Sequence, residues 1–195
     1  METITLASTS PQRQAILQQL HIPFIVAAPQ TEEAFDDNLS PQKNVEHIAM
    51  KKAEAALSIP TALSTRYLIA ADTLVFLHGQ PIGKPPTACE ARKLLQSYSN
   101  TAHTVISAIC CYTAERQRFS TITSLSHVFF KPLTGREIDW YLSLGEWRNA
   151  AGGYRIQGAA ACLISRIEGS YSGIMGLPIY ELYAILTQEG YHFHS

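Results

Sequence analysis

The sequence has little excess charge, few cysteines and no long apolar run. Lysine and arginine number 15 against 16 aspartate and glutamate residues, so the chain lacks the basic surface with which proteins bind long nucleic acids. No apolar segment approaches the length of a membrane span, and the amino terminus enters a strand pattern directly instead of a signal peptide. We therefore expect a cytoplasmic protein without membrane or long nucleic-acid partners, in which any phosphate-binding charge is local.

Cysteine use gives no sign of a disulfide framework or a metal cluster. The four cysteines, Cys89, Cys110, Cys111 and Cys162, form no CxxC pair and show no metal-ligand spacing. Their surroundings are apolar or helical, which predicts reduced, buried thiols. Repeats, low-complexity segments and linkers are also missing, and 195 residues suffice for one substantial core. We expect a single domain over residues 1–195, with two lobes around a cleft.

One segment, Tyr67–Leu77, is apolar at odd and even positions alike, apart from a single carboxylate. That pattern predicts a strand covered on both faces. Asp72 shares a face with Leu68, Ala70 and Leu74, so its carboxylate should be poorly solvated. A buried carboxylate needs a metal ion, a cation or convergent hydrogen-bond donors. The alternative is a structural aspartate that caps a neighbouring loop at the end of the strand.

The amino-terminal strand, expected over residues 4–7, leads directly into a helix start. Ser10 is a favourable N-cap and Pro11 a favourable first helical residue. With Ser8 and Arg13 nearby, the free backbone N–H groups, hydroxyls and guanidinium could together bind an anion. An ordinary capped helix with a solvated arginine is the structural alternative.

A second helix is predicted from Pro41 to about Ser58, and Lys52 falls on its apolar face. A lysine in that position either extends to solvent or meets a buried anion. The acidic run before the helix, residues 31–37, is either solvated surface or the source of one carboxylate for a hard cation. Gly83-Lys84-Pro85 has neither the spacing nor the Ser or Thr of a P-loop, but Lys84 could still reach a phosphate.

The remaining pattern alternates strands and helices. An antiparallel pair is expected because two long β-rich runs are separated by a short polar segment. Gly152 and Gly153 form a glycine pair that could let a flat ligand approach the backbone. His103 is interpreted as a structural residue at a strand end. The further predicted elements are a hairpin at 78–80, a helix over 87–98, strands over 103–113 and 119–131, a helix over 134–144, a strand over 159–166 and a helix from about 179.

These residues together resemble the Maf family of nucleoside triphosphate pyrophosphatases, almost from end to end. The resemblance is carried, in chain order, by Leu6-Ala7-Ser8-Thr9-Ser10-Pro11-Gln12-Arg13, Glu33, Lys52-Ala53, Ala71-Asp72-Thr73, Gly83-Lys84-Pro85, His103, Gly152 to Gly158 and Gly176-Leu177-Pro178. It implies an α/β fold in which helices flank an extended mixed β-sheet with a deep central cleft, similar to inosine triphosphate pyrophosphatases. It also implies a homodimer.

The activity implied by the resemblance is hydrolysis of a nucleoside triphosphate to the monophosphate and pyrophosphate, assisted by a divalent cation, Mg²⁺ or Mn²⁺. Asp72 would be the catalytic general base, and Glu33 and Asp72 would hold the metal. The residues expected to bind the nucleotide substrate are Ser8, Ser10, Gln12, Arg13, Lys52, Thr73, Lys84 and Gln157. Among them, Thr73 and Gln157 would contact the base.

Two positions favour dTTP, UTP or modified pyrimidine nucleotides as substrates. Thr73 and Gln157 resemble the dTTP/UTP class, whereas Gln12 matches neither that class nor the one acting on methylated guanine nucleotides. The family's Asp-Lys is Asn149-Ala150 here, and a usual glycine is Arg155. The lysine replaced by Ala150 and the arginine replaced by Gln12 are two potential phosphate partners that this chain lacks, unless Arg148 or Arg155 replaces them. These departures leave open a nucleotide-binding regulator with weak catalysis, a preference for another modified nucleotide, or a structural domain without ligand.

Overall fold

The computed structural model describes residues 1–31 and 34–194, in which one mixed sheet of seven strands forms the centre of the molecule. Its spatial order is β2-β1-β3-β5-β6-β7, and β4 pairs with part of β3. β1 runs parallel to β2 and β3, and every other pairing is antiparallel. The strands are β1 (Ile4–Leu6), β2 (Phe24–Val26), β3 (Tyr67–Leu77), β4 (Gln80–Ile82), β5 (Ala102–Thr113), β6 (Arg118–Phe130) and β7 (Ile164–Glu168).

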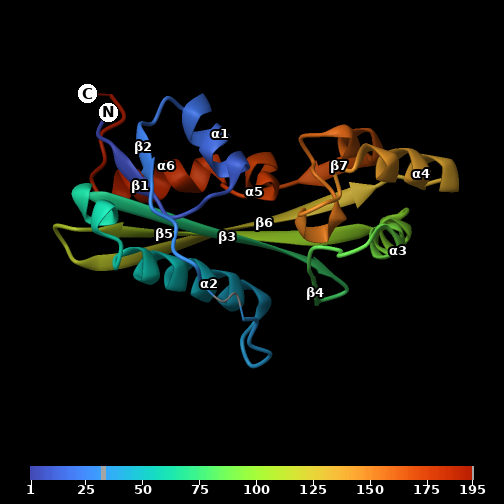
Figure 1. Cartoon of the computed structure of the whole chain (residues 1–195), viewed down its shortest axis with the longest axis horizontal. Helices are drawn as coiled ribbons and strands as arrows, with labels where there is room; N and C mark the ends of the chain where they lie inside the picture. The colour runs from blue at the N-terminus through green and yellow to red at the C-terminus, as the bar shows by residue number, and fades with distance from the viewer. Residues whose placement is uncertain (32–33, 195) are drawn as a thin grey trace.

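Helices cover both faces of this sheet (Figure 1). α2 lies along one face, α1, α5 and α6 lie on the other, and α3 and α4 lie towards the end away from the termini (Figure 1). The predicted α/β class with a helix-flanked mixed sheet is therefore confirmed. The helices are α1 (Pro11–Gln19), α2 (Pro41–Ala56), α3 (Ala88–Tyr98), α4 (Gly135–Leu144), α5 (Tyr171–Met175) and α6 (Ile179–Gln188). Within the described part of the chain, none has the length and hydropathy to cross a bilayer.

The long central strand β3 is buried on both faces, as its sequence predicts. Leu68 and Ala70 belong to the core under α2, whereas Ile69 and Ala71 belong to the core under α1 and α6. Successive side chains of a strand point to opposite faces. The neighbours Asp72 and Thr73 therefore project to opposite sides of the sheet.

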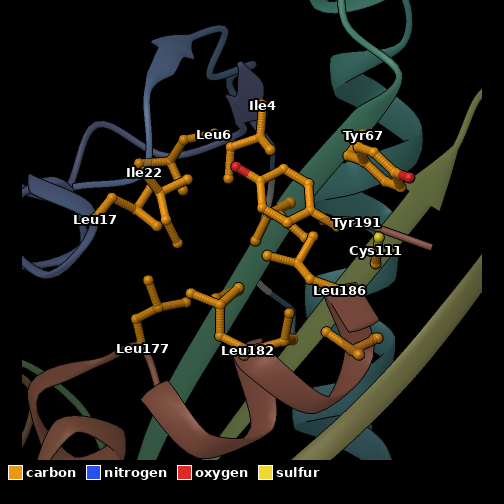
Figure 2. Close-up of a cluster of buried hydrophobic side chains, with 14 of the residues drawn as sticks. Ile4, Leu6, Leu17, Ile22, Tyr67, Cys111, Leu177, Leu182, Leu186 and Tyr191 are labelled. Atoms are coloured by element: carbon orange, nitrogen blue, oxygen red, sulfur yellow. The ribbon is translucent and has the colours of Figure 1, made fainter. Parts of the chain in front are cut away.

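The core on the α6 side fixes the amino-terminal strand in place. Figure 2 shows side chains of β1, α1 and α6 that point towards one another, including Leu6, Leu17 and Leu182. The Tyr191 hydroxyl donates to the main-chain oxygen of Glu2 at 2.8 Å, so the two ends of the chain are joined. Burial of this cluster holds β1 against β3 and places the segment after β1 beside the middle of β3.

Some predictions of local structure were wrong. The expected strand over 159–166 is instead a 3₁₀ helix, Ala159–Leu163, and β7 begins at Ile164. Three successive alanines have no β-branched side chain to favour a strand, and the Glu146 carboxylate accepts the Ala159 N–H at 2.9 Å. The short helix α5 was not predicted.

The cysteines are also only partly as expected. Cys110 and Cys111 are buried in β5, and burial raises the pKa of each thiol to about 12. Cys89 and Cys162 are exposed, which corrects the prediction of uniformly buried thiols. Cys89 lies on the outer surface of the amphipathic α3, where helical surroundings do not imply burial.

Candidate functional site

A large cleft lies where the edge of β3 loses its neighbouring strand. β1 pairs with β3 only at Leu68 and Ile69, and β4 pairs with it only from Val75 onwards. Between these contacts that edge of β3 is open. The cleft there has a volume of about 1000 Å³ and includes Ala7, Thr73 and Val75 in its walls. Such a change of neighbours at the end of a parallel strand is a frequent location for ligand sites in α/β proteins.

Every residue predicted to contact substrate lines this one cleft. They are Ser8, Ser10, Gln12, Arg13, Lys52, Thr73, Lys84 and Gln157. Asp72 itself lies behind the cleft wall, in contact with Lys52. Glu33, the other predicted metal ligand, lies outside the described residues.

The segment after β1 forms the first wall. Ser10 Oγ caps α1 by accepting the Arg13 N–H at 3.5 Å, and Ser8 Oγ accepts from the Ser10 N–H at 3.2 Å. The Arg13 guanidinium donates to Ser8 Oγ at 3.0 Å and to the main-chain oxygen of Gly176 at 2.9 Å. The helix cap is therefore present. The guanidinium does not extend into solvent, because Ser8 and the main chain at Gly176 hold it at the cleft.

Lys52 and Asp72 form a buried ion pair between α2 and β3. Lys52 Nζ donates to Asp72 Oδ1 at 2.6 Å, and the side chains are only 11% and 5% exposed. Of the two alternatives for a lysine on the apolar face of α2, contact with a buried anion is therefore confirmed. Helical periodicity predicted the inward position, because Val45, Ala49 and Ala53 of the same face are buried as well.

The second oxygen of Asp72 indicates where a cation would fit. Oδ2 is buried and has no hydrogen-bond partner among the described residues, which is a costly state for a carboxylate oxygen. No group of three or more His, Cys, Asp or Glu side chains able to hold a metal occurs in residues 1–31 and 34–194. This donor set suits Mg²⁺, which is usually held by one or two carboxylates together with water and substrate phosphates.

The opposite wall comes from the segment between α4 and β7. The Gly152 N–H donates to the main-chain oxygen of Gly83 at 3.1 Å, so this wall is attached to the segment that carries Lys84. Arg155 lines the cleft, and its guanidinium donates to the main-chain oxygens of Glu146 at 3.1 Å and Arg148 at 2.9 Å. Of the two arginines considered as replacement phosphate ligands, Arg155 thus reaches the cleft. Arg148 instead lies over the ring of Trp147, 4.9 Å from its centroid.

Tyr154 lines the same wall and was not singled out from the sequence. Its hydroxyl shares a 2.8 Å hydrogen bond with Nε2 of His103, whose ring stacks on Tyr98 at a centroid distance of 4.4 Å. Burial lowers the pKa of His103 to about 4, so this imidazole is neutral at pH 7. His103 is therefore a structural residue behind the wall, as expected. Its partner is 51 positions away in sequence, too far for any local pattern to reveal.

Comparison with known proteins gives consistent matches over almost the whole chain. A family model described as "Maf-like protein" matches residues 3–189. The dTTP/UTP pyrophosphatase of Treponema denticola is 41% identical over an alignment 197 positions long, which covers 96% of this chain and 97% of that protein. The dTTP/UTP pyrophosphatase of Symbiobacterium thermophilum is 37% identical over 192 residues, covering 98% and 96% respectively.

The fold is also similar to that of a solved structure. The Staphylococcus aureus Ham1 protein superposes with a TM-score of 0.52 and 15% sequence identity, over 96% of this chain and 100% of that one. At this identity the similarity concerns the fold alone. It agrees with the extended, helix-flanked sheet described above.

Proposed function

Since this chain belongs to the Maf-like protein family, we propose that it hydrolyses nucleoside triphosphates, with dTTP and UTP as substrates, to the monophosphate and pyrophosphate. The observation that carries the proposal is the convergence of Arg13, Lys52 and Lys84 on one cleft, beside the buried carboxylate of Asp72. The volume of that cleft, about 1000 Å³, is sufficient for a nucleotide. The curated relatives support the choice of nucleotide by their names.

The cationic side chains would bind the triphosphate. Its negative charge must be neutralised for a nucleophile to approach phosphorus, and most of the catalysis in such reactions comes from charge and positioning. Arg13 can form paired hydrogen bonds with phosphate oxygens, and the amino terminus of the nine-residue helix α1 adds backbone N–H donors. Ser8, Ser10 and Gln12 add polar groups on the same wall.

Asp72 would orient the water that attacks the α-phosphorus and accept its proton. Lys52 donates to Oδ1 and so fixes the direction of the carboxylate, and Oδ2 has no protein donor among the residues described. Asp72, with Glu33 from the part of the chain not described, would hold Mg²⁺ or Mn²⁺. When bound, such an ion supplies charge neutralisation for the phosphate oxygens.

The part of the cleft lined by Thr73, Val75, Tyr154, Ile156 and Gln157 would bind the nucleoside. Thr73 and Gln157 can hydrogen-bond to the edge of a pyrimidine, because a hydroxyl and an amide provide both acceptors and donors. Val75, Tyr154 and Ile156 line the same space and provide apolar contact for a flat ring.

A product analysis tests this proposal. The purified protein is incubated with Mg²⁺ and each of dTTP, UTP, CTP and a set of modified nucleotides, and the products are separated by ion-exchange chromatography. We expect monophosphate and pyrophosphate in equal amounts, fastest from dTTP and UTP. Nucleotide binding without pyrophosphate release would instead support a regulator, and release of orthophosphate would show cleavage of a different bond.

A further inference from the structure

A line of hydrogen-bonded groups runs from the cleft through β5 to α5. Ser107 Oγ donates to the main-chain oxygen of Gly173 at 2.6 Å. Thr73 Oγ1 lies 2.7 Å from Ser107 Oγ, and Thr73 lines the cleft. Ser107 is only 1% exposed, so bulk water does not compete for its hydroxyl.

The direction of these hydrogen bonds follows from the number of hydrogens available. A serine hydroxyl carries one hydrogen, and a carbonyl oxygen can only accept. Because the hydrogen of Ser107 is directed to Gly173, Ser107 can only accept from Thr73. The single hydrogen of Thr73 is therefore committed to Ser107, and the Thr73 hydroxyl offers the cleft lone pairs and no donor.

An acceptor that cannot become a donor restricts which ligand group lies opposite it. Uracil and thymine carry an N3–H, whereas N3 of cytosine is itself an acceptor and would face Thr73 without a hydrogen between them. Gln157 on the other wall cannot make this distinction alone, because turning its amide exchanges donor for acceptor. An ionised phosphate oxygen opposite Thr73 would likewise be repelled.

We propose that Ser107 is a positioning residue that fixes Thr73 as a hydrogen-bond acceptor, and that this acceptor selects uracil and thymine nucleotides over cytosine nucleotides. The inference rests on the proposed function, since it needs the base to lie against Thr73. It adds a buried residue that does not line the cleft to those that determine substrate choice.

The test measures kcat/KM for UTP and CTP in the wild type and in Ser107→Ala. Without Ser107, the Thr73 hydroxyl can rotate and donate to N3 of cytosine, so the UTP-to-CTP ratio should fall about fivefold or more. Thr73→Val, which removes the acceptor while keeping the shape, should lower the same ratio mainly through slower UTP hydrolysis. An unchanged ratio in either variant would overturn the inference.

Ser126→Ala is the matched control. Ser126 Oγ accepts the Ser170 N–H at 2.9 Å and so anchors the start of α5, but it does not contact Thr73. We expect the UTP-to-CTP ratio of this variant to equal that of the wild type. If Ser126→Ala lowers the ratio as much as Ser107→Ala, looser anchoring of α5 is the cause and the inference is wrong. If the wild type hydrolyses neither nucleotide, the proposed function itself fails.

Discussion

Lys52 and Asp72 form an ion pair in which both side chains are buried. Removing two charges from water costs several kcal/mol per ion, and a buried pair commonly stabilises a protein no more than apolar residues of the same size would. Here the pair leaves the buried Asp72 Oδ2 without a hydrogen-bond donor among the described residues, and Lys52 lines a large cleft. A role in binding or catalysis explains this arrangement better than a role in stability.

His103 predicts a pH dependence of stability. Burial among Tyr98, Phe130 and Tyr154 lowers its pKa from 6.5 to about 4, so the unfolded chain binds a proton at higher pH than the folded one. Stability from the neutral imidazole is complete above pH 6.5 and is lost as the pH falls towards 4. The loss should be on the order of 3 kcal/mol.

Urea unfolding of wild type and His103→Gln at several pH values between 7 and 4 measures this effect. The variant should lose about 3 kcal/mol less than the wild type across the interval, whatever its stability at pH 7. The same substitution at solvent-exposed His192 is the control and should leave the pH dependence as in wild type. Equal slopes in wild type and His103→Gln would contradict a buried neutral imidazole.

The burial of a single residue could be predicted from sequence when its neighbours showed which face of the helix or strand is apolar. Lys52 was placed inward by the period of α2, and the burial of Asp72 followed from the apolar strand around it. Tyr154 and Ser107 could not be identified in this way. Tyr154 depends on His103, 51 positions away, and Ser107 depends on Gly173, 66 positions away. Only the folded sheet brings these partners together.

At the scale of elements, one carboxylate fastens the end of α6 to the β5–β6 hairpin. Glu189 follows the last residue of α6 and is completely buried. Burial alone would raise its pKa, but hydrogen bonds from Arg118, Ser120 and Thr113 lower it below the ordinary value. The carboxylate oxygens accept from Arg118 at 2.8 Å and from Ser120 at 2.6 Å.

Glu189→Ala should therefore destabilise the protein by about 2–4 kcal/mol, because a completely buried carboxylate is removed and its donors, including the buried Thr113, lose their acceptor. The free energy of unfolding from urea denaturation at pH 7 gives the value. Glu115→Ala is the control: its carboxylate is 61% exposed and pairs with Arg66, so the loss should stay below about 1 kcal/mol. A similar small loss for Glu189→Ala would show that the cluster does not fasten the helix.

Gly152 lies in the segment between α4 and β7 that forms one wall of the cleft, and its backbone conformation and close neighbours constrain this segment. Its φ is +71°, and a Cβ there would lie 3.1 Å from Val75 and 3.2 Å from the Tyr98 hydroxyl. Gly152→Ala should destabilise the protein by about 1–3 kcal/mol and lower kcat/KM for UTP, since this segment lines the cleft. Gly135→Ala, where an added Cβ meets nothing within 4 Å, should change neither quantity appreciably. Equal behaviour of the two variants would contradict a constrained wall.

Elements with strong local signals were predicted well. Ser40-Pro41 and the capping box of Thr134 with Glu137 begin α2 and α4 where expected. The long strands β5 and β6 pair as an antiparallel hairpin, as their composition indicated. The short α5 and the 3₁₀ helix at Ala159–Leu163 were missed because each is only five residues long, too short for a periodic pattern.

At the scale of the molecule, the cleft exists because β1 ends early and β4 begins late along β3. The local sequence pattern could not predict where β1 ends and β4 begins along β3. The expectation that the site residues lie close together therefore came from the resemblance to a known family. The two-lobed single domain, the homodimer and the cytoplasmic location remain predictions. Analytical ultracentrifugation would test the homodimer.

Removal of the metal tests whether the proposed reaction requires a divalent cation. With excess EDTA, pyrophosphate release from UTP should fall by at least about a hundredfold, and added Mg²⁺ or Mn²⁺ should restore it. Folding should survive the treatment, which circular dichroism would check, because the hydrophobic cores of the described chain contain no Asp, Glu or His side chains. Full activity in EDTA would show that cationic side chains alone neutralise the triphosphate.

The most direct test of the proposed mechanism is the rate of pyrophosphate release from UTP by Asp72→Asn, measured beside wild type with Mg²⁺. The amide keeps the size of the carboxylate but can neither accept a proton nor neutralise Lys52 and a cation. We expect a loss of about a thousandfold or more in a variant that remains folded by circular dichroism. A folded Asp72→Asn protein that releases pyrophosphate at the wild-type rate would remove Asp72 from catalysis.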